Sequence, residues 1–367
     1  MGQPAMTYPH VPSVLHRLRV SKTSTLLVLV AVVSMMFTGA TSGQETTPGQ
    51  FTGGIQTELP DWFKESFLEF EDDIDEAVAA GKRLMLYFHQ DGCPYCNALI
   101  EHNFELADIQ EQIRSNLDVV AINIFGDLEV VSVGGKAFTE KTLAQALRVN
   151  YTPTLLFFNE KREVALRLDG YYPPKQFRTA LNYVTQRKDL EVSYQRYLET
   201  VAAPTATGSL HSESFFTVAP HNLDRSSGAH IRPLAVFFEQ KQCEECTLLH
   251  TNTLSDPATR KIVEQFDAVQ LDMWSDDELV TPEGEAMTAR EWATKLGIKF
   301  APTIVLFDRS GAEVMRSGAF LKTFHIQSVL DYVLSGAYKM QPNFQRYISA
   351  RSESLRERGI NVDIWDY

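Results

Sequence analysis

The chain has 367 residues, of which 44% are hydrophobic, so it is long enough for two domains with ordinary apolar cores. Its formal net charge is −13, and three basic and no acidic residues precede position 41. The remainder therefore carries 31 basic and 47 acidic residues, a charge of −16, which argues against nucleic acid or an anionic membrane surface as a partner.

The first forty residues have the pattern of an export signal. Basic residues between His16 and Lys22 precede an apolar stretch at 25–37, and small residues at 38–40 offer a cleavage site. The apolar stretch is short for a membrane span. We therefore predict a cleaved signal peptide over 1–40, with an uncleaved N-terminal anchor as the alternative.

Folded structure is predicted to begin after a linker of Thr, Ser, Gly, Gln and Pro at 41–60. Phe67, Phe70, Ile74 and Ala77 recur at helical spacing. The short apolar run 84–88 then predicts a buried strand.

Cys93-Pro94-Tyr95-Cys96 follows this strand and opens a stretch with helical spacing. Two cysteines three positions apart are within bonding reach, and the first lies where unpaired N–H groups and the helix dipole stabilise a thiolate. Pro94 fits the first helical turn, where a backbone N–H has no acceptor within the helix and the one that proline lacks is not needed. The pattern predicts a dithiol/disulfide redox centre; a structural disulfide and half of a zinc site are the alternatives.

The elements that follow alternate between helix and strand. We predict helices at 108–113, 140–147 and from Lys175, strands at 119–124, 155–158 and 164–168, and an insert at 125–138. This order predicts an α/β fold with a mixed central sheet covered by helices on both faces. Thr152-Pro153 directly precedes the strand at 155–158, and a proline there needs a special placement because it cannot donate to the ladder.

The same pattern then repeats. Cys243-Glu244-Glu245-Cys246 follows the apolar run 234–238, and Ala301-Pro302 precedes the run 304–307. The first cysteine and the proline are 60 residues apart in the first copy and 59 in the second. We predict domains at 61–201 and 211–350, a flexible linker at 202–210 and a C-terminal tail at 351–367.

Strand, Cys-x-x-Cys, helix and a later X-Pro before a strand resemble the thioredoxin superfamily. The resemblance implies two tandem thioredoxin-like domains, each with a cis proline packed against its disulfide. The long insert and the Tyr-Gln-Arg-Tyr extension at 194–197 are most similar to the SoxW-type exported thioredoxins. Those proteins reduce or exchange disulfides in the bacterial periplasm.

The resemblance implies a periplasmic thiol:disulfide oxidoreductase with no cofactor, acting on client proteins that carry disulfides or thiols. Its electron donor is expected in the membrane or the periplasm. Cys93 would be the nucleophile and Cys96 the resolving thiol. Cys243 and Cys246 would form a second catalytic pair, with a structural disulfide as the alternative for this pair. The predicted substrate-binding residues are Pro94, Tyr95, Thr152, Pro153, Ala301 and Pro302.

Two features depart from thioredoxin itself. Pro94-Tyr95 replaces the Gly-Pro dipeptide, and Tyr87 and Phe237 occupy the position of the buried proton-accepting aspartate. His89 or water could take over this role. The alternative function is a client-binding module whose disulfides stay closed. Cys243, Cys246 and His250 have ligand types for zinc, but a fourth ligand is lacking nearby, and no metal is predicted.

Overall fold

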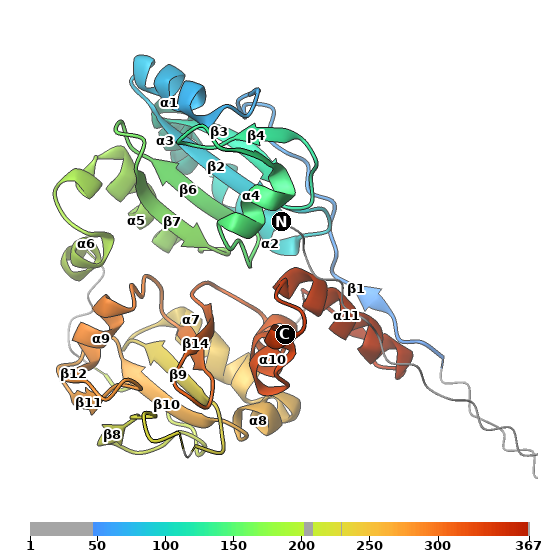
Figure 1. Ribbon diagram of the computed structural model, residues 1–367, viewed down its shortest axis with the longest axis vertical. Helices are drawn as coiled ribbons and strands as arrows, with labels where there is room; N and C mark the ends of the chain where they lie inside the picture. The colour runs from blue at the N-terminus through green and yellow to red at the C-terminus, as the bar shows by residue number, and fades with distance from the viewer. Residues whose placement is uncertain (1–46, 202–207, 229, 366–367) are drawn as a thin grey trace, which may run out of the picture. The chain divides into compact units, whose positions relative to one another are not determined.

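The computed structural model describes residues 47–201, 208–228 and 230–365 (Figure 1). The predicted signal peptide at 1–40, residues 41–46 and residues 202–207 of the predicted linker lie outside the described residues. No helix within the described ranges is long and apolar enough to cross a bilayer.

The first domain has a four-stranded mixed sheet in the order β3-β2-β6-β7, in which β3 and β2 pair in parallel and the other neighbouring pairs are antiparallel. Its elements in chain order are α1 (Phe70–Ala79), β2 (Arg83–His89), α2 (Pro94–Leu99), α3 (Ala107–Asn116), β3 (Leu117–Asn123), β4 (Glu129–Val131), β5 (Ala137–Thr139), α4 (Glu140–Ala146), β6 (Thr154–Phe158), β7 (Val164–Asp169), α5 (Pro174–Thr185) and α6 (Tyr194–Val201). The predicted α/β fold and its helix–strand order are confirmed.

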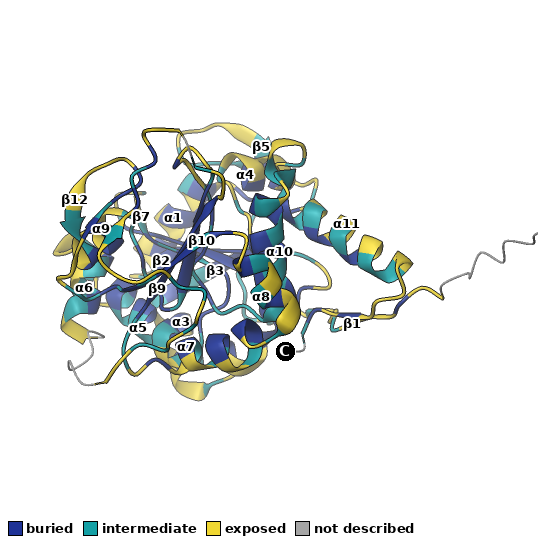
Figure 2. Cartoon of the chain, turned by 90° about the horizontal axis from the view of Figure 1, so that it is seen from below, coloured by how far each residue is buried: buried dark blue, intermediate teal, exposed yellow. Residues whose placement is uncertain are grey.

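Both faces of this sheet are buried, which explains why β2 is a continuous apolar run. Alternate residues of β2 point to opposite faces. Leu84, Leu86 and Phe88 pack with α1 and α4 in one core, whereas Met85 and Tyr87 pack with α2, α3 and α5 in the other. Figure 2 shows the strands of the central sheets largely buried and outer helices such as α11 exposed along one side.

The second domain repeats this sheet in the order β10-β9-β13-β14. Its elements are β8 (His221–Asn222), β9 (Leu234–Glu239), α7 (Glu244–Leu248), α8 (Pro257–Val263), β10 (Asp267–Asp272), β11 (Glu278–Val280), β12 (Ala286–Thr288), α9 (Ala289–Lys295), β13 (Thr303–Phe307), β14 (Glu313–Ser317), α10 (Thr323–Leu334) and α11 (Phe344–Glu357). The short strand β8 pairs with β11 as Glu69, just before α1, bridges to Val131 of β4 in the first domain, and the Ala219–Pro220 peptide bond before β8 is cis.

The helix after each Cys pair changes its hydrogen-bond pattern partway along. A π-helical turn follows α2 at Ile100–Phe104 (η1), and another follows α7 at Leu249–Leu254 (η3). Such turns insert one extra residue per turn and often occur at functional sites. Apolar spacing predicts a helix here but not this change of pitch.

The segments at the two ends of the described chain pair with each other. β1 (Phe51–Thr52) runs parallel to β15 (Val362–Asp363), and Gly49 N–H donates to the Arg356 carbonyl oxygen at 2.8 Å. Part of the segment predicted as a linker at 41–60 is therefore an ordered strand, and the tail left unassigned by the sequence supplies its partner. Composition alone gives no signal for such short pairings.

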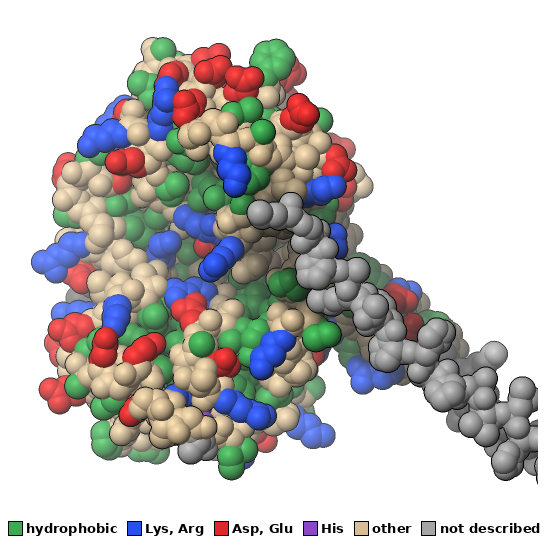
Figure 3. Space-filling view, viewed as in Figure 1, with side chains coloured by type: hydrophobic (Ala, Val, Ile, Leu, Met, Phe, Trp, Pro, Cys, Tyr) green, Lys and Arg blue, Asp and Glu red, His purple; other side chains and the backbone are tan. Residues whose placement is uncertain are grey.

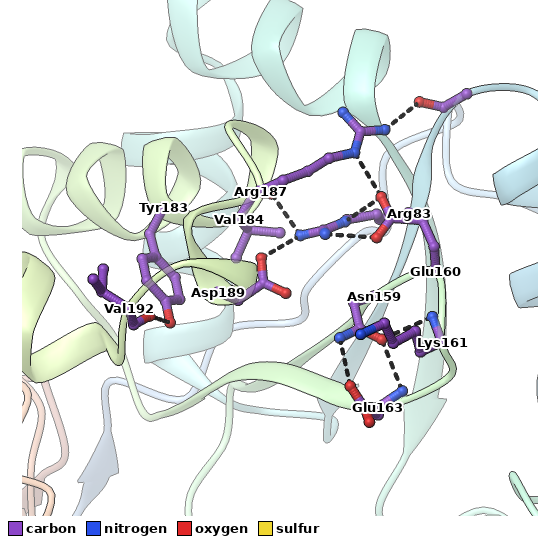
Figure 4. A network of polar contacts seen from close by, with 11 residues as sticks. Arg83, Asn159, Glu160, Lys161, Glu163, Tyr183, Val184, Arg187, Asp189 and Val192 are labelled. Carbon is purple, nitrogen blue, oxygen red and sulfur yellow. Dashed lines mark hydrogen bonds and ion pairs between the residues drawn. The ribbon is translucent and has the colours of Figure 1, made fainter.

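A buried arginine fixes the start of β2 in the first domain (Figure 4). The Arg83 side chain is only 2% exposed; its guanidinium lies 2.7 Å from Asp189 Oδ1 and 2.7 Å from Glu160 Oε2. It also donates to the Val184 carbonyl oxygen at 2.7 Å. This network joins the sheet to the end of α5, and Pro233 stands at the matching position of the second domain.

Candidate active site

Cys93 and Cys96 form a disulfide at the start of α2, with their Cα atoms 5.3 Å apart. Cys93 is the N-cap residue, and its sulfur accepts the backbone N–H of Cys96 at 3.0 Å. Pro94 occupies the first helical position, as predicted. Cys93 is 2% exposed and Cys96 is fully buried, so the first sulfur is nearer the surface.

The loop before β6 contacts the same sulfur. Cys93 Sγ lies 3.5 Å from the Thr152 carbonyl oxygen and accepts a hydrogen bond from the Thr152 hydroxyl at 3.3 Å. The Thr152–Pro153 peptide bond is cis, which confirms the prediction. The chain thus brings residues 59 positions apart into one site around Cys93.

The second pair repeats this arrangement without the hydroxyl. Cys243 and Cys246 are disulfide-bonded with Cα atoms 5.1 Å apart, and Cys243 accepts the Cys246 N–H at 3.0 Å. Cys243 Sγ lies 3.5 Å from the carbonyl oxygen of Ala301, and the Ala301–Pro302 bond is cis as predicted.

A cavity of about 400 Å³ borders the first centre. Cys93, Pro94, Tyr95 and Thr152 line it, whereas Cys96 does not. Its other walls come mainly from α11, from residues 90–92 before the first cysteine and from the segment around β1, among them the following residues: Phe51, Gln345, Ser349 and Arg356. Four of the residues predicted to bind substrate or react are therefore gathered at one opening. Of the prolines predicted to bind substrate, Pro302 lines a smaller pocket with Glu245.

At the position of the missing aspartate, neither Tyr87 nor Phe237 supplies a side chain that exchanges a proton near neutral pH. Burial raises the pKa of Tyr87 well above its usual value, and its hydroxyl lies 3.5 Å from the Cys96 carbonyl oxygen. Burial also lowers the pKa of His89, partly opposed by Asp91. His89 stacks on Tyr87 with ring centroids 5.6 Å apart, and no contact of its side chain with either sulfur is present among the described residues.

A buried acid was missed by sequence reasoning in the second domain. Glu239, at the end of β9, is fully buried and lies 3.0 Å from His250 Nε2, while His250 Nδ1 lies 3.0 Å from Glu213. Burial opposes protonation of His250, but the hydrogen bonds and charges of the two glutamates outweigh it and raise the pKa of the imidazole. Arg260 pairs with Glu213 at 2.7 Å and extends the chain of charges to the surface.

The zinc-ligand types noted at the second pair have other partners in this structure. Both ring nitrogens of His250 face glutamate oxygens, and both sulfurs of the pair are bonded to each other. Within the described ranges, no three His, Cys, Asp or Glu side chains gather as metal ligands.

Comparison with known proteins identifies the folding unit. The family model of the thioredoxin-like domain matches residues 70–185 and again residues 220–334. No curated protein matches the chain significantly.

Among solved structures, a thioredoxin-fold protein from Helicobacter pylori is 22% identical, covering 32% of this chain and 78% of its own, with a TM-score of 0.29. A thioredoxin from Thermus thermophilus is 21% identical, covering 37% and 87%, with a TM-score of 0.26. The first two thioredoxin domains of Saccharomyces cerevisiae Eps1p are 12% identical, covering 68% and 88%, with a TM-score of 0.24.

Proposed function

The chain belongs to the thioredoxin-like domain family, with two copies in tandem, and from that membership we propose that it is a thiol:disulfide oxidoreductase. The observation that carries the proposal is the placement of Cys93. It caps a helix, accepts a backbone N–H, and is the one cysteine of its pair that borders the cavity. A thiolate formed at this sulfur meets hydrogen-bond donors and an opening to solvent together.

The reduced pair reduces a client disulfide in two steps. The Cys93 thiolate attacks one client sulfur, so a Cys93–client bond forms, the client S–S bond breaks and the released client thiolate takes up a proton. Cys96 then loses its proton and attacks Cys93 Sγ, which releases the second client thiolate, and this thiolate also takes up a proton. The client gains two electrons and two protons, and the Cys93–Cys96 disulfide present in this structure is the product.

The Thr152 loop supports binding of the client chain. The Thr152 carbonyl and hydroxyl both lie against Cys93 Sγ, so a chain paired along this loop would have its disulfide beside the sulfur. We assign Pro94, Tyr95, Thr152 and Pro153 to client contact at the first centre, and Ala301 and Pro302 at the second.

We further propose that the protein works in the periplasm as a relative of the SoxW-type exported thioredoxins. The apolar stretch at 25–37 with its basic flank supports export, and the four cysteines all lie in two disulfides, as expected outside the cytosol. Its partners are client proteins with disulfides or thiols and a membrane or periplasmic electron donor. Figure 3 shows both acidic and basic side chains over the visible face, with several Lys and Arg side chains gathered midway between its two ends.

Single cysteine variants test the proposal. In a background with Cys243→Ser and Cys246→Ser, Cys93→Ser should abolish catalysis of insulin reduction by dithiothreitol and leave only the uncatalysed rate. Cys96→Ser should instead accumulate a mixed disulfide at Cys93, visible as an adduct by mass spectrometry. Full turnover by either variant would refute the assignment.

The second candidate is a client-binding module with closed disulfides. It is favoured by the burial of the nucleophilic sulfurs, since Cys93 is 2% and Cys243 is 6% exposed. Thiol titration of the native protein separates the two functions. If both pairs are redox-active, the number of titratable thiols per chain rises from zero to four after treatment with a mild dithiol. If the protein is a binding module with closed disulfides, the number stays at zero after the same treatment.

A further inference from the structure

The second domain holds the dipeptide between the first two cysteines. The Tyr95 hydroxyl lies 3.1 Å from Nδ1 of His325 and accepts the backbone N–H of Lys322 at 2.9 Å. Burial, together with a smaller effect of Arg351, lowers the pKa of His325 to about 3, so the imidazole is neutral near neutral pH. In the tautomer with an unprotonated Nδ1, this nitrogen accepts the Tyr95 hydroxyl proton. Tyr95 is 4% exposed, and its ring also packs edge-on against Trp365.

The first domain makes the matching contact with the second pair. Gln176 Nε2 donates to Glu245 Oε1 at 2.6 Å. Tyr95 and Glu245 are the residues directly before the second cysteine of each pair, and Gln176 and His325 are each the third residue of the matching helices α5 and α10. The two contacts are therefore equivalent under the repeat, although the residue types differ.

The loops before the two cis prolines are exchanged in the same manner. Tyr151 packs in the core of the second domain, against Phe344 with ring centroids 5.6 Å apart. Phe300, at the corresponding position, packs in the core of the first domain against Tyr172, at 5.1 Å. Gln345 of α11 adds a hydrogen bond to the Asn150 carbonyl oxygen at 2.8 Å.

From these reciprocal contacts we propose that His325 and Gln176 are positioning residues acting across the domain boundary: each holds the Cys-x-x-Cys dipeptide of the opposite domain and so sets the redox equilibrium of that centre. Neither residue touches the reacting sulfurs. The inference rests on the proposed function only in taking both pairs as redox centres, since it concerns their equilibrium and not their turnover.

The expected direction of the shift in each dithiol/disulfide equilibrium follows from the redox state in which the His325 and Gln176 contacts are seen. Both are present with the disulfides closed, and the dipeptide is the segment that must adjust when the S–S bond opens. A hydrogen bond fitted to the closed form favours the disulfide. Its loss should raise the ratio of dithiol to disulfide at a fixed redox poise by about threefold to tenfold, which is about 15 to 30 mV for a two-electron couple.

A crossed pair of variants provides the test. His325→Ala and Gln176→Ala are each equilibrated in glutathione buffers, in which two glutathiones give one glutathione disulfide and one protein dithiol. Differential alkylation and peptide mass mapping then read both pairs in the same molecule. His325→Ala should shift Cys93–Cys96 toward the dithiol and leave Cys243–Cys246, in its own domain, unchanged; Gln176→Ala should do the reverse.

Tyr95→Phe removes only the hydroxyl and guards against a general loss of structure. It should reproduce the His325→Ala shift, and the double variant should add nothing to either. An unshifted Cys93–Cys96 equilibrium in both variants, or an equal shift of the two pairs in His325→Ala, would overturn the proposal. Because these equilibria need no client, a protein without turnover but with crossed shifts would refute the proposed function and leave this inference standing.

Discussion

At the level of single residues, the two cysteine centres share the same backbone geometry and differ in the side chains beside the first cysteine. Both first cysteines accept the N–H of the second at 3.0 Å, so this hydrogen bond does not distinguish them. Cys93 has the additional hydroxyl of Thr152, where the second centre has Ala301. Cys243 has two glutamates in its dipeptide instead of Pro94 and Tyr95.

We therefore expect Cys243 to be the weaker acid. A carboxylate about 6 Å from a thiolate raises its energy by roughly 0.7 kcal/mol in water and about 2.8 kcal/mol at an effective dielectric of 20, against about 0.3–1 kcal/mol returned by the helix dipole. Lys241 offers little relief because Asp272 lies 3.7 Å from its ammonium. The Cys243 pKa should exceed that of Cys93 by up to about two units.

The rate of alkylation against pH, measured on variants that keep one reduced pair, checks this order. Glu244→Gln with Glu245→Gln should lower the Cys243 pKa, and Thr152→Ala should raise that of Cys93 by removing a donor to the thiolate. A wild-type Cys243 that titrates below Cys93 would contradict the argument.

Two histidines should give opposite pH dependences of stability. The pKa of His250 is raised in the folded protein, so its contribution is complete below the unfolded value of about 6.5 and is lost as the pH rises through the folded pKa. The pKa of His325 is lowered to about 3, so its contribution is complete above about 6.5 and falls as the pH drops toward 3, by up to about 1.4 kcal/mol per pH unit.

The free energy of unfolding is measured between pH 4 and pH 9 for the wild type, His250→Gln and His325→Gln. Subtracting each variant from the wild type isolates the contribution of that histidine to stability. The His250 difference should shrink with rising pH and the His325 difference should shrink with falling pH. Two differences of the same slope would show that at least one assigned environment is wrong.

Much of the candidate site could be predicted from the sequence because its residues lie in short motifs. The cysteine pairs and the cis prolines Pro153 and Pro302 belong to patterns with a fixed spacing, whereas the cis Pro220 belongs to none. The contacts of Tyr95 with His325 and of Glu245 with Gln176 could not, because they join residues 230 and 69 positions apart. The aligned repeat did contain a signal: it places Gln176 and His325 at matching positions.

At the level of helices and strands, the sequence predicted the elements correctly where apolar residues recur at the period of a helix or form a continuous buried run. The run at 84–88 lies within β2, and the helix predicted from Lys175 is α5. Phe67 was placed with Phe70 at helical spacing but precedes α1 and is 98% exposed, since Leu68 adopts a positive φ that no helix tolerates. Apolar spacing does not report such a break.

The Arg83 network makes a prediction for the first domain. Arg83→Ala should lower the free energy of unfolding by about 3–5 kcal/mol, because it leaves the buried carboxylate of Asp189 without its cation. Urea denaturation followed by circular dichroism measures the change. Adding Asp189→Asn should recover part of the loss, whereas a cost below about 1 kcal/mol for Arg83→Ala alone would show that the network contributes little.

At the level of the whole molecule, the repeat is more than a duplication in sequence. Each domain donates the residue two positions before its cis proline to the core of the other, so the active-site loops are also parts of the interface. The family match shows two thioredoxin-like units, but not this exchange. The sequence repeat likewise predicted two domains and a linker without indicating that they share cores.

The central claim is that both cysteine pairs are redox centres and not structural disulfides. Redox titration of the unmodified protein, with both pairs read by alkylation and peptide mass mapping, tests it most directly. We predict that each pair titrates reversibly as a two-electron couple between about −270 and −120 mV, the range of thioredoxin-like dithiols. Disulfides that remain closed below about −300 mV, as structural disulfides do, would contradict the account.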